Sequence, residues 1–133
     1  MNNIRFLIIL LLFSFEVLAD QNDKRLDELF RILEKSKDVN EMNNITKSIW
    51  KIWLEPNNPL IEHDFNQGIK LMQSGRLQES IKMFTQVIDN NPSFAEGWNK
   101  RATIYYLIGD FDSSVLDIKE TLKLEPRHFG AMD

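Results

Sequence analysis

The 133-residue chain contains no cysteine, which excludes disulfide bonds, thiolate zinc sites, a catalytic cysteine and a cysteine-linked lipid anchor. Five glycines and four prolines are too few for a collagen-like or proline-rich disordered chain. Basic residues are also in deficit, since 16 basic and 20 acidic residues give a net charge of -4. We expect no nucleic-acid partner, because such a site needs a clustered positive field. The length favours one small domain.

Residues 1–19 are typical of a secretory signal peptide. Arg5 is the single charge before an apolar run over residues 6–13, and Val17 and Ala19 stand where a signal peptidase prefers small residues. An uncleaved membrane anchor is the alternative, but about ten apolar helical residues reach only about 15 Å, roughly half of a hydrocarbon core. We expect an exported, periplasmic chain whose contact with the membrane is limited to this signal peptide.

The second half of the chain repeats its residue types at an offset of 34 positions. The matching pairs are Gly68 and Ala102, Leu71 and Tyr105, Gly75 and Gly109, Ser80 and Ser114, Phe84 and Ile118, Pro92 and Pro126. Gly75 and Gly109 suit the positive φ of a turn between helices, and Pro92 and Pro126 end a helix. Gly68 falls inside a helix, which predicts that another backbone approaches closely there. Paired helices with this period indicate a solenoid.

Apolar spacing predicts three helical hairpins and no strand. The expected helices cover about residues 23–36, 38–55, 59–74, 76–90, 93–108 and 110–124. Caps are expected at Asp38, Asn58, Ser93 and Asp110, and both Asp38 and Ser93 are followed three positions later by a glutamate in a capping-box pattern. The predicted fold is an all-α, short α-solenoid of antiparallel hairpins behind a signal peptide. A divergent hairpin covers 20–56, repeats cover 61–94 and 95–128, and a further repeat begins at 129–133.

The repeated segment resembles the tetratricopeptide repeat. Counted from Ala95, the fourth, eighth, eleventh, fifteenth, twentieth, twenty-fourth and thirty-second places hold Trp98, Ala102, Tyr105, Gly109, Ser114, Ile118 and Pro126. The copy that begins at Ile61 places Asp64, Gly68, Leu71, Gly75, Ser80, Phe84 and Pro92 there. Asp64 departs from the family's tryptophan, and Arg101 departs from its leucine. The later copy is also similar to exported alphaproteobacterial proteins of this family.

The resemblance implies a peptide-binding groove lined by the first helices of successive repeats. The residues at its usual lining places are Glu62, Phe65, Ile69, Met72, Glu96, Asn99, Thr103 and Tyr106. Their helical spacing allows one common face. The alternative is that Phe65, Ile69 and Met72 are covered by the first hairpin. Since Phe65 and Ile69 replace the family's carboxylate-binding Lys and Asn, we expect an adaptor or scaffold that binds another kind of protein or peptide segment.

Catalysis and metal binding are not expected. His63 and Asp64 resemble a base and its orienting carboxylate, but adjacent helical side chains point about 100° apart. No nucleophile elbow or phosphate loop accompanies them, so no cofactor is expected. His63 and His128 lie far apart in sequence and lack a metal-ligand motif. An enzyme with an unrecognised site remains the remote alternative.

Two further features concern packing. Trp50 and Trp53 are expected to pack the first hairpin onto the first repeat, with an exposed ligand patch as the alternative. The basic pairs at residues 100–101 and 127–128 are interpreted as salt-bridged charge. Phe129 and Met132 occupy the first and fourth places of a further repeat, so either the chain is truncated or another molecule covers the sixth helix. The second reading allows self-association through that helix as an alternative function.

Overall fold

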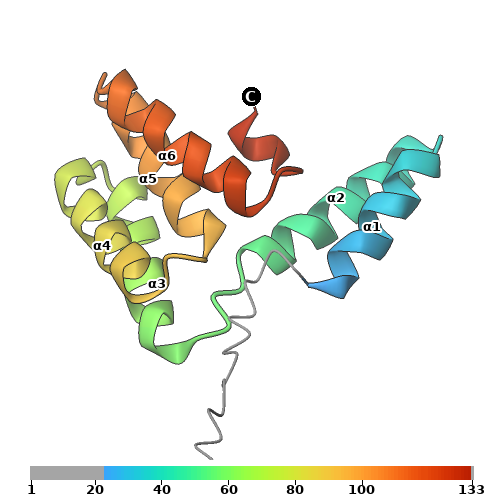
Figure 1. Ribbon diagram of the computed structural model, residues 1–133, viewed down its shortest axis with the longest axis horizontal. Coiled ribbons are helices and arrows are strands. Elements are labelled where there is room, and N and C mark those ends of the chain that lie inside the picture. Colours follow the sequence, from blue (N-terminus) through green and yellow to red (C-terminus); the bar gives the residue numbers. More distant parts are fainter. Residues whose placement is uncertain (1–22, 133) are drawn as a thin grey trace, which may run out of the picture.

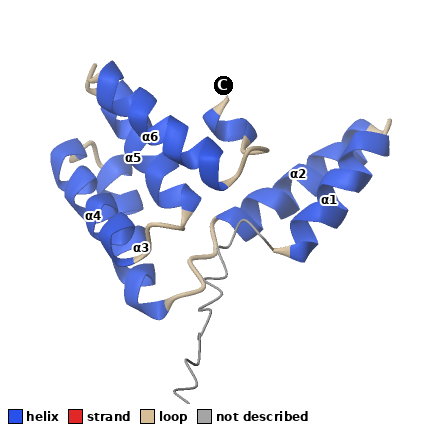
Figure 2. Ribbon diagram, in the orientation of Figure 1, coloured by secondary structure: helices blue, strands red, loops and turns tan. Residues whose placement is uncertain are grey.

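The computed structural model describes residues 23–132, and every regular element in that range is helical (Figure 2). The elements are α1 (Lys24–Lys35), α2 (Val39–Trp53), α3 (Pro59–Gln73), α4 (Leu77–Asn90), α5 (Ala95–Leu107), α6 (Phe111–Leu124) and the 3-10 turn η2 (Phe129–Ala131). These bounds confirm the all-α prediction. The expected signal peptide at 1–19 lies outside the described residues, and within them no helix has the length and apolar character needed to cross a membrane.

Local hydrogen bonds set where most helices begin. Three predicted caps accept a backbone N–H bond, and they are Asp38, Asn58 and Asp110. The predicted capping box at the start of α5 is wrong, because Phe94 is its N-cap and the Ser93 hydroxyl donates to the Asn91 side chain. Glu96, the other half of that box, turns inward and binds His128 at 2.8 Å. The bond between Glu96 and the distant His128 therefore replaces the expected local bond between Glu96 and the backbone of Ser93.

The helices pair as antiparallel hairpins that follow one another along the chain (Figure 1). The α3–α4 and α5–α6 turns lie at the same end of the molecule, and α4 packs against α5. Both turns contain a glycine with positive φ, 75° at Gly75 and 81° at Gly109. A side chain would be strained in this left-handed conformation, so the repeated glycines have the conformational role that the sequence predicts.

The second hairpin reproduces buried bonds of the first at the 34-residue offset. The Ser80 hydroxyl donates to the Gly68 carbonyl at 2.8 Å, and the Ser114 hydroxyl donates to the Ala102 carbonyl at 2.9 Å. At Gly68 a Cβ atom would lie 2.8 Å from the Phe84 ring, so a side chain, rather than the predicted backbone, requires the glycine. The two hairpins therefore share this buried bond as well as the sequence pattern.

Arg101, which departs from the family pattern, joins three helices. Its guanidinium donates to both Asp117 oxygens at 2.8 and 2.9 Å, and to the Thr85 hydroxyl at 3.0 Å. These bonds connect α5 to α6 and α4, and Asp117 raises the pKa of Arg101.

Residues 23–132 contain two separate apolar cores. The repeat core contains Ile61, Phe65, Phe84, Val87, Phe94 and Ile104. The core of the first hairpin contains Leu26, Ile45, Ile49, Ile52 and Trp53. Figure 1 shows the α1–α2 hairpin extending away from α3–α6, with residues 125–132 between the two parts. We call residues 125–132 the C-terminal segment.

Candidate partner-binding site

The C-terminal segment packs against the aromatic side chains of α2. His128 stacks on Trp53 with ring centroids 4.2 Å apart, and Phe129 meets Trp50 edge to face at 5.3 Å. Gly130 lies against the Trp50 ring. Trp53 is fully buried, as the packing interpretation requires, and the rings that both tryptophans meet outside the first hairpin are those of His128 and Phe129. The tryptophans contact the C-terminal segment because its aromatic residues offer matching flat surfaces.

Arg127 extends this junction to α1. Its guanidinium binds Asp27 at 2.8 Å and lies 4.6 Å from the centroid of the Phe30 ring. The same guanidinium binds the buried Glu125 carboxylate at 3.0 Å, which orients it. The predicted salt bridging of this basic pair is confirmed for Arg127, and it joins segments 100 residues apart.

The junction contains a buried polar cluster around Glu96. Both Glu96 and His128 are fully buried, and the His128 Nε2 atom donates to Glu96 Oε2 at 2.8 Å. Asn99 donates to the same oxygen at 3.1 Å, while the Lys100 ammonium lies 2.8 Å from Oε1. Burial alone would raise the pKa of Glu96, but the hydrogen bond from His128 and the positive charge of Lys100 together hold it below its ordinary value. The cluster joins α5 to the C-terminal segment.

The four groove residues expected from the first repeat do not share one open surface. They are Glu62, Phe65, Ile69 and Met72. The Phe65 side chain is only 3% exposed, and its ring packs edge to face against Phe84 and Phe94. Ile69 and Met72 are partly buried against the same core. Helix α4 and the start of α5 cover these apolar residues, rather than the first hairpin.

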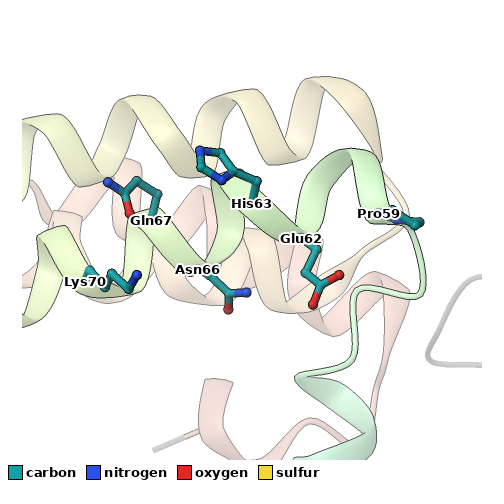
Figure 3. Close-up of a pocket in the computed structure, with 6 residues that line it drawn as sticks. All are labelled: Pro59, Glu62, His63, Asn66, Gln67 and Lys70. Atoms are coloured by element: carbon teal, nitrogen blue, oxygen red, sulfur yellow. The ribbon is translucent and has the colours of Figure 1, made fainter.

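Glu62 lies instead on the exposed polar side of α3. Figure 3 shows it along one side of that helix with Pro59, His63, Asn66, Gln67 and Lys70, which line an open pocket of about 340 Å³. His63 therefore belongs to a solvated helix face. Among residues 23–132 no group of three or more His, Asp and Glu side chains is gathered closely enough to hold a metal ion. The α3 polar face is the surface formed by Pro59, Glu62, His63, Asn66, Gln67 and Lys70.

Three of the four groove residues expected from the second repeat do lie together. Asn99, Thr103 and Tyr106 line a pocket of about 350 Å³, whereas Glu96 points into the junction. The remaining lining residues are Ala102, Ser114, Ile118, Gly130 and Ala131. Asn99 is mostly buried and Tyr106 is 64% exposed, so the pocket runs from a polar floor to an aromatic rim.

Exposed apolar side chains continue this pocket towards the α5–α6 turn. Phe111 is 59% exposed and meets Tyr106 edge to face at 5.5 Å, and Val115 is 48% exposed. The α5–α6 face is the surface formed by Asn99, Thr103, Tyr106, Phe111, Ser114, Val115 and Ile118. Sequence reasoning omitted the α6 residues of this face, although the 34-residue offset relates Ile118 to the buried Phe84. Gly130 and Ala131 carry no such signal, because long-range packing brings them there.

The stacked hairpins define a helical-repeat protein of the short α-solenoid class. The chain is 31% identical over 109 residues to a TPR repeat-containing protein of Rhizobium etli. The six-helix fold is consistent with repeats of the tetratricopeptide type, so the chain resembles this relative in fold as well as in sequence. The match covers 82% of this chain and 53% of the relative, so the chain spans about half of the relative's length. No family model matches the chain. Proteins with this repeat generally bind protein partners and are typically non-catalytic.

Proposed function

We propose that this chain is an adaptor that binds a partner protein or peptide on its α5–α6 face. The observation that carries the proposal is the pocket lined by Asn99, Thr103 and Tyr106, whose aromatic rim continues to the exposed Phe111 through its contact with Tyr106. A contiguous exposed apolar surface around a concave site is typical of an interaction site. Aromatic residues such as Tyr106 also contribute much of the binding energy at protein interfaces.

The face is held in shape by bonds that do not involve a ligand. The Ser114 hydroxyl binds the Ala102 carbonyl at 2.9 Å, and the Thr103 hydroxyl binds the Asn99 carbonyl at 3.0 Å. Arg101 of α5 also joins α6 through its ion pair with Asp117. Because these bonds already order the receptor, little conformational entropy is lost there on binding. The proposed mechanism is passive presentation of fixed side chains.

This role requires no chemical reaction, and we propose that the chain is not an enzyme. The His63 side chain, the best catalytic candidate of the sequence, lies on the α3 polar face, where the other pocket-lining residues are Pro59, Glu62, Asn66, Gln67 and Lys70 (Figure 3). We also propose that the adaptor works outside the cytoplasm, most simply in the periplasm. Support for export comes from the signal-like residues 1–19 alone.

Site-specific photo-crosslinking tests the binding proposal. A photoreactive amino acid replaces Thr103 on the α5–α6 face or, as a control, Gln67 on the α3 polar face of the full chain in its native cells. We expect defined crosslinked products from position 103 that Tyr106→Ser removes, and no such products from position 67. Equal crosslinking from both positions, or none from position 103, would refute the proposal.

Self-association through α6 is the second candidate. Its support is the exposure of Leu116, at 62%, and of Val115. Sedimentation of the full chain tests it: a dimer that Leu116→Glu converts to monomer, while Tyr106→Ser leaves it intact, would favour this structural role. A monodisperse monomer would remove it.

A further inference from the structure

Most of the buried ionisable side chains lie at the junction between the first hairpin and the repeats. Within residues 23–132 the buried ionisable side chains are Glu96, Asp117, Glu125 and His128. Asp117 pairs with Arg101 inside the repeats, whereas the other three lie in or beside the C-terminal segment. Every residue of the two apolar cores is uncharged. A change of protonation therefore acts on the junction more than on either core.

The C-terminal segment holds the first hairpin against the repeats. Figure 1 shows the hairpin extending away from α3–α6, with that segment between the two parts. Phe129 packs against the hairpin core, and Arg127 binds Asp27 of α1. The covalent connection, residues 54–58, lies outside the helices, so its backbone dihedral angles can absorb a rotation. The orientation of the hairpin therefore depends on the contacts of the C-terminal segment.

Carboxylates accept the bonds by which Arg127 and His128 join this segment to the helices. Glu96 of α5 accepts from His128 at 2.8 Å, and Asp27 of α1 accepts from Arg127 at 2.8 Å. A third carboxylate, that of the buried Glu125, orients the Arg127 guanidinium. Acidification protonates carboxylates, so it weakens all of these contacts together.

The groups that face His128 act in the same direction. Glu96 faces it from α5 and binds the Lys100 ammonium through its other oxygen, while α2 contributes the uncharged rings of Trp50 and Trp53. The other charged groups of the junction are Asp27, Glu125 and Arg127. Loss of the Glu96 charge in acid leaves the His128 imidazolium and the Lys100 ammonium without a counter-charge. The His128 Nδ1 atom has no hydrogen-bond partner among the described residues, so the second N–H of an imidazolium would be buried without an acceptor.

We infer that Glu96 and His128 form an acid-sensitive latch that fixes the orientation of the first hairpin relative to the repeats. At neutral pH the ionised cluster holds the C-terminal segment between α2 and α5. In acid the junction opens and the hairpin moves about residues 54–58. Both apolar cores stay folded, because their residues carry no charge that titrates. This inference does not depend on what the α5–α6 face binds.

The environment of Glu96 determines the pH range in which the latch opens. Burial raises the pKa of Glu96, but the hydrogen bond from His128 and the charge of Lys100 outweigh burial and hold it below the ordinary 4.5. A carboxyl group with a lowered folded pKa contributes fully above its ordinary value, and its contribution is lost as pH falls through the folded value. The latch is therefore closed at neutral pH and opens only below about 4.5.

Paired spin labels on the full chain measure the movement. The chain has no native cysteine, so Lys37→Cys at the tip of the first hairpin and Gln78→Cys on α4 provide two exposed attachment sites. A second pair, Gln78→Cys with Lys119→Cys on α6, reports on the repeats alone. Double electron–electron resonance gives the distance distribution of each pair, and far-UV circular dichroism gives the helix content at the same pH.

We expect the distance between positions 37 and 78 to be narrowly distributed at neutral pH and to broaden between about pH 4.5 and about pH 3. The distance between positions 78 and 119 and the helix content should stay unchanged over this range. Glu96→Gln should raise the open fraction at neutral pH by at least about tenfold, because it removes one partner of a buried ion pair. Asp117→Asn removes the buried carboxylate of the repeats and is the matched control, which should remain closed at neutral pH.

A distance between positions 37 and 78 that stays narrow until the helices unfold would overturn the latch. A Glu96→Gln variant as closed as the wild type at neutral pH would also overturn it, and so would an Asp117→Asn variant that opens as readily as Glu96→Gln. The wild-type titration needs no substitution in the cluster, so it remains decisive even if Glu96→Gln does not fold.

Discussion

Substitution of Gly130 by alanine tests whether the C-terminal segment holds the first hairpin in place. A methyl group at this position would overlap Trp50 Cη2 and lie 2.9 Å from Cζ2. The Trp50 indole cannot move freely, because the rings of Trp53 and Phe129 pack against it with centroids 5.3 Å from its own. Overpacking of this kind costs about 1–3 kcal/mol. Alanine also lowers the conformational entropy of the unfolded chain, which offsets about 0.4–1 kcal/mol of this cost. This gain applies at position 130 because the φ of Gly130 is not positive and alanine can adopt it.

The expected net effect is a decrease of about 1–2 kcal/mol in the free energy of unfolding. Urea denaturation followed by tryptophan fluorescence measures it, because Trp50 and Trp53 both lie at the junction. Met132→Ala, at an exposed position of the same segment, is the control and should change stability by less than about 0.5 kcal/mol. If Gly130→Ala is as harmless as the control, the C-terminal segment does not pack on α2 as described.

Two further predictions concern buried polar contacts. Ser80→Ala and Ser114→Ala should each lower the free energy of unfolding by about 1 kcal/mol in urea titrations, because each removes a buried hydrogen bond between neighbouring helices. A large loss for only one serine would contradict the equivalence of the hairpins. Since the folded pKa of Glu96 lies below the ordinary 4.5, its stabilising contribution is complete above that pH and is lost as pH falls through the folded pKa. The stability difference between wild type and Glu96→Gln should therefore shrink on acidification, and a difference independent of pH from 7 to 3 would count against the ionised cluster.

Local sequence signals predicted the helices well. Asp38, Asn58 and Asp110 cap their helices because the donor N–H groups lie only two or three positions away. The 34-residue offset likewise predicted Gly75 and Gly109 in positive φ. Each of these features depends on a short stretch of chain, which is why the sequence alone contains the necessary information.

Features that depend on distant partners were not predicted. Glu96 has the spacing of a capping box, but its partner His128 is 32 residues away and no periodic pattern relates them. Trp50 and Trp53 were expected to be core, yet the segment that covers them follows α6. For the same reason only Asn99, Thr103 and Tyr106 of the eight expected groove residues share a pocket. Helical spacing predicts a common face but not which neighbouring element covers it.

The position of Arg127 also has a consequence for the order in which the protein folds. The first hairpin has its own core, and so do the repeats, so each can form while synthesis continues. Their mutual orientation depends on Arg127 and the residues beside it, which follow Asp27 by 100 positions. Until the ribosome has released the C-terminal segment, only residues 54–58 connect the first hairpin to the repeats. A chain truncated after residue 124 should therefore expose Trp53 to solvent and to proteases, although it contains the whole of α1–α6.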